Sequence, residues 1–145
     1  MGVGTNAAAG YGPRQVEILF LEAKAWTAQA DQRNEEALAW MIQAADQEDA
    51  LEKRPVTPGP MVPARELLGE MLLAAGQPQR ALAAFEQCLA ESPKRFNGLY
   101  GAGCAAAAVG ERARARDFFR QLVETCHRAD SPRPELLAAR HALEQ

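Results

Sequence analysis

Side chains that could do chemistry are few in this sequence and widely spaced. The three cysteines, Cys88, Cys104 and Cys126, form no CxxC pair, so neither a disulfide framework nor a zinc site is indicated. Cys126 and His127 are adjacent, and neighbouring side chains on a helix point apart, so they do not pair as nucleophile and base. No GxSxG, HExxH, P-loop or dinucleotide-binding motif is present. We therefore predict no catalytic residue, no metal site, no cofactor and no enzymatic activity.

A stripe of arginines is the one feature that could contact nucleic acid. Arg112, Arg116 and Arg120 recur every four residues and so share one face of a helix. Glu111 and Asp117 balance them locally, and the formal net charge of the chain is −3, whereas nucleic-acid-binding domains are usually basic. The stripe is better interpreted as a solvated helix face, and we expect no nucleic-acid partner.

The composition favours helices that pack closely. Hydrophobic residues make up 48% of the 145 residues, alanine is the commonest of them, and aromatic residues make up only 6%. The longest apolar run, residues 104–109, is far shorter than a membrane span. Residues 1–12 are rich in glycine and alanine and lack the features of a signal peptide, so we expect a disordered segment there. Three cysteines without a disulfide framework suit a reducing compartment, so a cytoplasmic location is predicted, without membrane association.

Apolar spacing predicts a series of helices separated by glycine and proline. Asn34 is the expected N-cap of the second helix, with Glu35 and Glu36 in its first turn. Residues 54–60 contain three prolines and a glycine and are expected to be extended. The expected helices cover about residues 13–30, 34–51, 63–76, 78–92, 97–109, 111–128 and 132–144.

A period of 34 residues organises these helices. Four pairs of identical residues stand 34 apart: Gly69 and Gly103, Gly76 and Gly110, Ala81 and Ala115, and Phe85 and Phe119. Small residues recur where two helices must touch, and a phenylalanine recurs where the space between hairpins must be filled. Glycine recurs where a tight turn needs the left-handed conformation. Such a period indicates a solenoid of helical hairpins.

These positions resemble the tetratricopeptide repeat, whose pattern is W-x2-L-G-x2-Y, then A-x3-F, then P. Residues 62–95 match through Leu68-Gly69, Ala81-x3-Phe85 and Pro93; residues 96–129 match through Ala102-Gly103 and Ala115-x3-Phe119, with His127 replacing the proline. A degenerate first repeat fits residues 18–51 through Ala25, Ala28, Ala37, Met41 and Ala44. The proline-rich joint and the segment after it resemble a junction in bacterial proteins of this class whose function is not established.

The resemblance implies an all-α, right-handed α-hairpin solenoid. We expect one domain over residues 13–145, with hairpins at about 13–53, 62–93 and 96–128 and a capping helix at about 132–144. In this class the first helix of each hairpin lines a concave face that binds peptides or proteins. The corresponding candidates here are Glu22, Trp26, Gln29, Glu66, Glu70, Leu73, Asn97, Tyr100 and Cys104.

The candidate face carries both aromatic and acidic side chains. Trp26 and Tyr100 suit a groove that grips a peptide, although they could instead pack between hairpins. Some members of this class hold a C-terminal carboxylate with Lys and Asn, but Glu66 and Glu70 would repel one here. A basic or neutral ligand therefore fits better.

The sequence thus predicts a protein- or peptide-binding scaffold or adaptor. The alternative is a structural or self-association module, the terminal part of a longer repeat array. The first helix carries Val16, Ile18, Leu19, Phe20 and Leu21, an apolar band too wide for one packing face. Our hypothesis is that a second copy covers this band in a homodimer.

Overall fold

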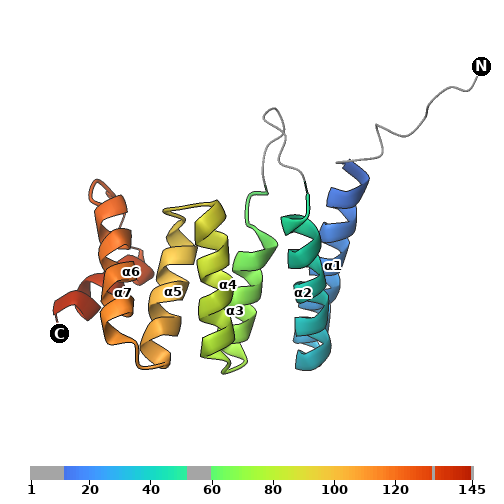
Figure 1. The fold of residues 1–145 in the computed structure, drawn as a ribbon, viewed down its shortest axis with the longest axis horizontal. Helices are drawn as coiled ribbons and strands as arrows, with labels where there is room; N and C mark the ends of the chain where they lie inside the picture. Colours follow the sequence, from blue (N-terminus) through green and yellow to red (C-terminus); the bar gives the residue numbers. More distant parts are fainter. Residues whose placement is uncertain (1–11, 52–59, 132, 145) are drawn as a thin grey trace, which may run out of the picture. The chain divides into compact units, whose positions relative to one another are not determined.

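The computed structural model describes residues 12–51, 60–131 and 133–144. These residues form seven helices and no strand, which confirms the all-α prediction (Figure 1). The sequence predicts disorder at residues 1–12, of which residues 1–11 lie outside the described residues, as does most of the expected extended joint; Gly12 instead begins the first helix. No described helix has the length and apolar character needed to cross a bilayer. The helices are α1 (Gly12–Ala30), α2 (Asn34–Asp49), α3 (Ala64–Ala74), α4 (Pro78–Glu91), α5 (Phe96–Ala108), α6 (Arg112–Thr125) and α7 (Pro134–Glu144).

The chain divides into two compact units, Met1–Ala64 and Arg65–Gln145. In the first unit α1 packs against α2. In the second, α5 packs against both α4 and α6, and α7 packs on α6 and touches α5. Helical hairpins are thus the building element of each unit.

The three hairpin turns share one backbone geometry. A residue with positive φ closes each turn: Gln32 at 61°, Gly76 at 68° and Gly110 at 86°. In each turn the next N–H donates to a carbonyl five residues earlier, which is the Schellman arrangement. These bonds run from Arg33 to Ala28 (2.8 Å), from Gln77 to Leu72 (2.9 Å) and from Glu111 to Ala106 (2.9 Å). The roles predicted for Gly76 and Gly110 are confirmed, whereas Gln32 adopts the same conformation against its intrinsic preference.

The prediction that Asn34 caps α2 is wrong by one residue. Arg33 occupies the N-cap position, and its carbonyl accepts the first helical hydrogen bond from Ala37 N at 2.9 Å. The reason is the preceding turn, which ends at Arg33 and leaves Asn34 already inside the helix. Glu36 lies in the first turn as expected and forms an ion pair with Arg33.

Phe85 fills the space between three helices of the second unit. Its side chain is 0% exposed, and a Cβ added to Gly69 on α3 would lie only 2.7 Å from its ring. A Cβ added to Gly101 on α5 would meet the same ring more closely still. Phe119, 34 residues later, is also buried and lies in the same way against Gly103. The predicted burial of both rings is confirmed.

Helix α7 covers α6 with only part of its predicted apolar face. The sequence predicts that Leu136, Leu137 and Leu143 lie on α6. Leu136 is buried, but Leu137 is 49% exposed, so this prediction is wrong for Leu137. The two residues are adjacent, and neighbouring side chains on a helix point in different directions. Arg116 of α6 donates a 3.0 Å hydrogen bond to the carbonyl of Leu143, so one arginine of the stripe helps to hold this cap.

We expect Phe85→Ala to lower the free energy of unfolding by about 3–5 kcal/mol, because the glycines around the ring cannot refill the cavity. Urea unfolding followed by circular dichroism measures this loss. Leu137→Ala is the matched control and should change the free energy by less than about 1 kcal/mol, since Leu137 is half exposed. Equal losses in the two variants would contradict the packing role of Phe85.

Candidate functional site

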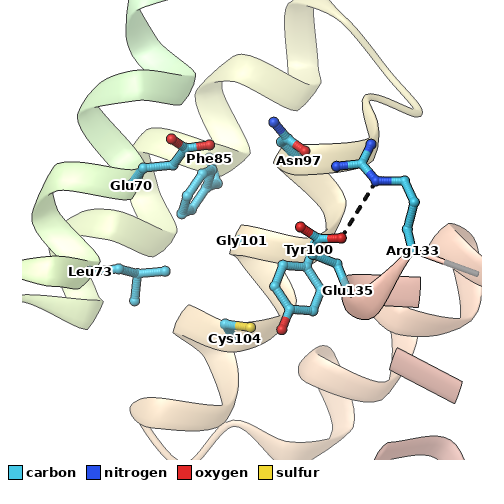
Figure 2. A pocket seen from close by; sticks show the side chains of 9 residues that line it. All are labelled: Glu70, Leu73, Phe85, Asn97, Tyr100, Gly101, Cys104, Arg133 and Glu135. Carbon is cyan, nitrogen blue, oxygen red and sulfur yellow. Dashed lines mark ion pairs between the residues drawn. The ribbon is translucent and has the colours of Figure 1, made fainter. Parts of the chain in front are cut away.

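A pocket of about 340 Å³ opens on the second unit between α3, α5 and the start of α7 (Figure 2). In Figure 2, side chains of α3 and α7 approach it from opposite sides, and α5 lies between them. Its volume falls at the lower end of the range for small-ligand pockets. Nine residues line it: Glu70, Leu73, Phe85, Asn97, Tyr100, Gly101, Cys104, Arg133 and Glu135.

Helical periodicity brings the α3 and α5 residues to the pocket. Glu70 and Leu73 are three residues apart and so share one face of α3. On α5, Asn97, Tyr100 and Cys104 follow one another at spacings of three and four, which again selects one face. Because Gly101 lies on this face without a side chain, the ring of Phe85 also borders the pocket.

The part of the pocket around Tyr100 carries neutral groups. The Tyr100 ring lies 6.1 Å from that of Phe119, and the Tyr100 hydroxyl and Cys104 thiol are hydrogen-bonded to each other. Burial is the main cause that raises the pKa of both side chains, so each stays protonated near neutral pH. A protonated thiol is a poor nucleophile. Among the described residues, no group of three or more His, Cys, Asp or Glu side chains is placed to hold a metal ion.

Arg133 and Glu135 at the start of α7 form a loose ion pair at the rim. The Nε atom of Arg133 lies 3.5 Å from Oε2 of Glu135, and its guanidinium carbon lies 4.0 Å from the centre of the Phe96 ring. Oε2 of Glu135 is shielded from solvent but accepts no hydrogen bond from the described residues. Glu135 therefore retains an unused acceptor beside the pocket.

Glu66, one of the predicted groove residues, lies in the core instead. Its side chain is 0% exposed and receives two hydrogen bonds from Arg95, Nε to Oε2 at 2.7 Å and Nη2 to Oε1 at 3.1 Å. Arg95 is the N-cap residue of α5, so this pair ties α3 to the start of α5. Burial, followed by the negative charge of Glu66, raises the pKa of Glu70 above its ordinary value.

The three candidates on α1 belong to the first unit, and none of them lines this pocket. Trp26 is partly exposed, and Gln29 is half-buried, with its Oε1 making no hydrogen bond within the described residues. Burial and then the charge of Glu48 raise the pKa of Glu22 to about 7. Glu22 is therefore only partly charged at neutral pH and contributes less negative charge than the sequence suggests.

Five of the six candidates in the second unit line the same pocket, namely Glu70, Leu73, Asn97, Tyr100 and Cys104. Sequence reasoning did not identify Phe85, Gly101, Arg133 and Glu135 as part of it. The repeat period gave no signal for Glu135, because the residue 34 positions earlier is Gly101, which is not one of the sequence candidates. Phe85 gave no signal either, since a buried packing ring and a pocket-lining ring look the same in the sequence.

Comparison with known proteins establishes the fold. No family model and no curated protein matches the sequence. The Sgt2 tetratricopeptide repeat domain from Aspergillus fumigatus is similar in structure, with a TM-score of 0.66 and 16% identity over 96% of this chain and 80% of that one. The first tetratricopeptide repeat domain of Spaghetti (RPAP3), bound to the HSP90 peptide SRMEEVD, is also similar. Its TM-score is 0.65 and its sequence identity 14%, over 88% of this chain and 94% of that one. The chain therefore has the tetratricopeptide repeat fold, as the sequence predicted.

We expect Arg95→Met to lower the free energy of unfolding by about 3–5 kcal/mol, because it leaves the Glu66 carboxylate buried without its partner. The double variant Glu66→Met/Arg95→Met should recover most of this loss, since no buried charge remains. Urea unfolding of the two single variants and the double variant gives the coupling free energy. A loss of less than about 1 kcal/mol in Arg95→Met would contradict the assigned role of the pair.

Proposed function

We propose that the chain is a peptide-binding scaffold and that its ligand occupies the pocket between α3, α5 and α7. The observation that carries the proposal is that residues from four separate elements meet around one opening. The similar domain of RPAP3 is bound to a peptide, which supports the same class of ligand here. An adaptor of this kind presents a partner protein to others and needs no chemistry of its own.

The pocket offers both kinds of contact that hold an extended peptide. The ring of Tyr100 and the side chain of Leu73 supply apolar area at low entropic cost. The Asn97 amide can donate to a peptide carbonyl and accept from a peptide N–H. We assign no catalytic step to this site, because Cys104 and Tyr100 are kept neutral by burial. Three cysteines that form no disulfide suit a cytoplasmic scaffold.

Self-association through α1 is the second candidate function. Val16, Leu19 and Phe20 are all exposed, and Phe20 remains 60% accessible. Ile18 and Leu21 of the same helix are buried, so the apolar band is divided between a packed face and an accessible one. Lys24 lies 4.7 Å from the centre of the Phe20 ring, but it covers only part of that face. The exposed part is the surface through which a second copy would pack.

We expect Tyr100→Ala to weaken peptide binding at least tenfold, because it removes the largest anchor on α5. Peptides are first selected against the intact protein from a random twelve-residue display library and then measured by fluorescence anisotropy. Trp26→Ala on α1 is the matched control, an accessible aromatic side chain outside the pocket, and should leave the affinity unchanged. Loss of binding in Trp26→Ala alone would show that the binding site lies on α1. A library that yields no binding peptide would refute the proposal.

We expect sedimentation equilibrium at micromolar concentration to show a dimer if α1 is a self-association surface. Leu19→Asp/Phe20→Asp should then shift the mass to that of a monomer, because burying two carboxylates in an apolar contact is unfavourable. The matched control is Leu137→Asp, which places the same charge on the exposed apolar residue of α7. A monomeric parent protein would exclude the homodimer.

A further inference from the structure

We propose that the pocket selects a cationic side chain, lysine or arginine, whose head group lies between the carboxylates of Glu70 and Glu135. This inference rests on the proposed peptide-binding function and names the ligand chemistry of the same site. It goes further than the sequence-based preference for a basic or neutral ligand, because it identifies the two carboxylates that would recognise the positive charge of the ligand.

The charges around the pocket favour a cation. The charged residues that line it are Glu70, Glu135 and Arg133, and Arg133 is paired with Glu135. Arg95, the N-cap residue of α5, is hydrogen-bonded to Glu66 and does not line the pocket. An anionic ligand would therefore meet two carboxylates and compete with them for a single arginine.

Glu135 has the acceptor that such a ligand needs. Its Oε2 atom is shielded from solvent and accepts no hydrogen bond among the described residues, while the nearby Nε of Arg133 is 3.5 Å away. The contact with Arg133 is an ion pair without a hydrogen bond, and a ligand ammonium or guanidinium N–H would supply the charge-assisted hydrogen bond that Oε2 lacks. Loss of the ion pair with Glu135 costs Arg133 little free energy, because its guanidinium keeps its contact with the Phe96 ring at 4.0 Å.

The remaining lining suits the aliphatic stem of the same side chain. Lysine and arginine carry three or four methylene groups that pack on apolar surface while the head group reaches polar partners. Leu73 on α3 and Tyr100 on α5 provide that surface. In Figure 2 the carboxylate of Glu70 points from α3 towards the same space that Glu135 borders from α7. A pocket of about 340 Å³ accommodates one long side chain with its adjoining backbone.

The experiment uses amino-acid probes whose side chains differ in charge. Nα-acetyl-lysine methylamide and Nα-acetyl-arginine methylamide are titrated into the ¹⁵N-labelled protein, alongside the neutral norleucine and the acidic glutamate analogues. We expect saturable shifts of the backbone amides of Tyr100, Gly101 and Cys104 with the cationic probes, and at least tenfold weaker binding of norleucine. A charge-assisted hydrogen bond is worth about this factor.

Charge-neutralising variants identify the groups responsible. Glu70→Gln and Glu135→Gln should each weaken binding of the lysine probe by about tenfold and leave the affinity for the norleucine probe unchanged. Glu124→Gln, at an exposed position of α6 outside the pocket lining, is the matched control and should bind like the parent protein. Superimposable spectra away from the pocket show that each variant is folded.

Three results would overturn the inference. Norleucine binding as tightly as lysine would show an apolar pocket, and a preference for the glutamate probe would show the opposite charge selection. Peptides from the display library that bind the pocket but are not enriched in lysine or arginine would refute cation selection while leaving peptide binding intact. If neither probes nor library peptides shift the α5 amides, the proposed function itself fails.

Discussion

The second unit depends on the contact between Phe85 and the two glycines that face it. Gly69 and Gly101 have no Cβ, so α3 and α5 can both approach a ring carried by α4. The Phe85 ring fixes the spacing of these three helices, because protein interiors are close-packed and a wider spacing would leave a void beside the ring. The same ring borders the pocket, so the packing that stabilises the unit also shapes its binding surface.

The Glu66–Arg95 pair links two of the helices that form the pocket. Arg95 is directed to a fully buried carboxylate and is absent from the pocket lining. The buried pair gives less net stability than its short hydrogen bonds suggest, since desolvation of both charges opposes them. Its main consequence is positional: it joins α3 to the first turn of α5 and leaves Glu70 to face the opening.

The errors in the sequence-based analysis have local and tertiary causes. Gln32 has no residue-type signal for a positive φ, yet it closes its turn as Gly76 and Gly110 do. The interval from Gln32 to Gly76 is ten residues longer than that from Gly76 to Gly110, so the period does not reveal the equivalence. Leu137 fits an apolar pattern on α7, but burial also depends on which side of that helix meets α6.

The sequence by itself determined the helices, the glycine turns and the period of 34, because these follow from local backbone preferences and from the spacing of small and large residues. It also indicated which face of α3 and α5 carries the candidate side chains, since helical periodicity alone defines a face. Only the tertiary structure decided that Glu66 is neutralised by Arg95, 29 residues away, and that the start of α7 completes the pocket with Glu135. Both outcomes depend on how separate helices pack, and no local pattern encodes the partner of a buried charge.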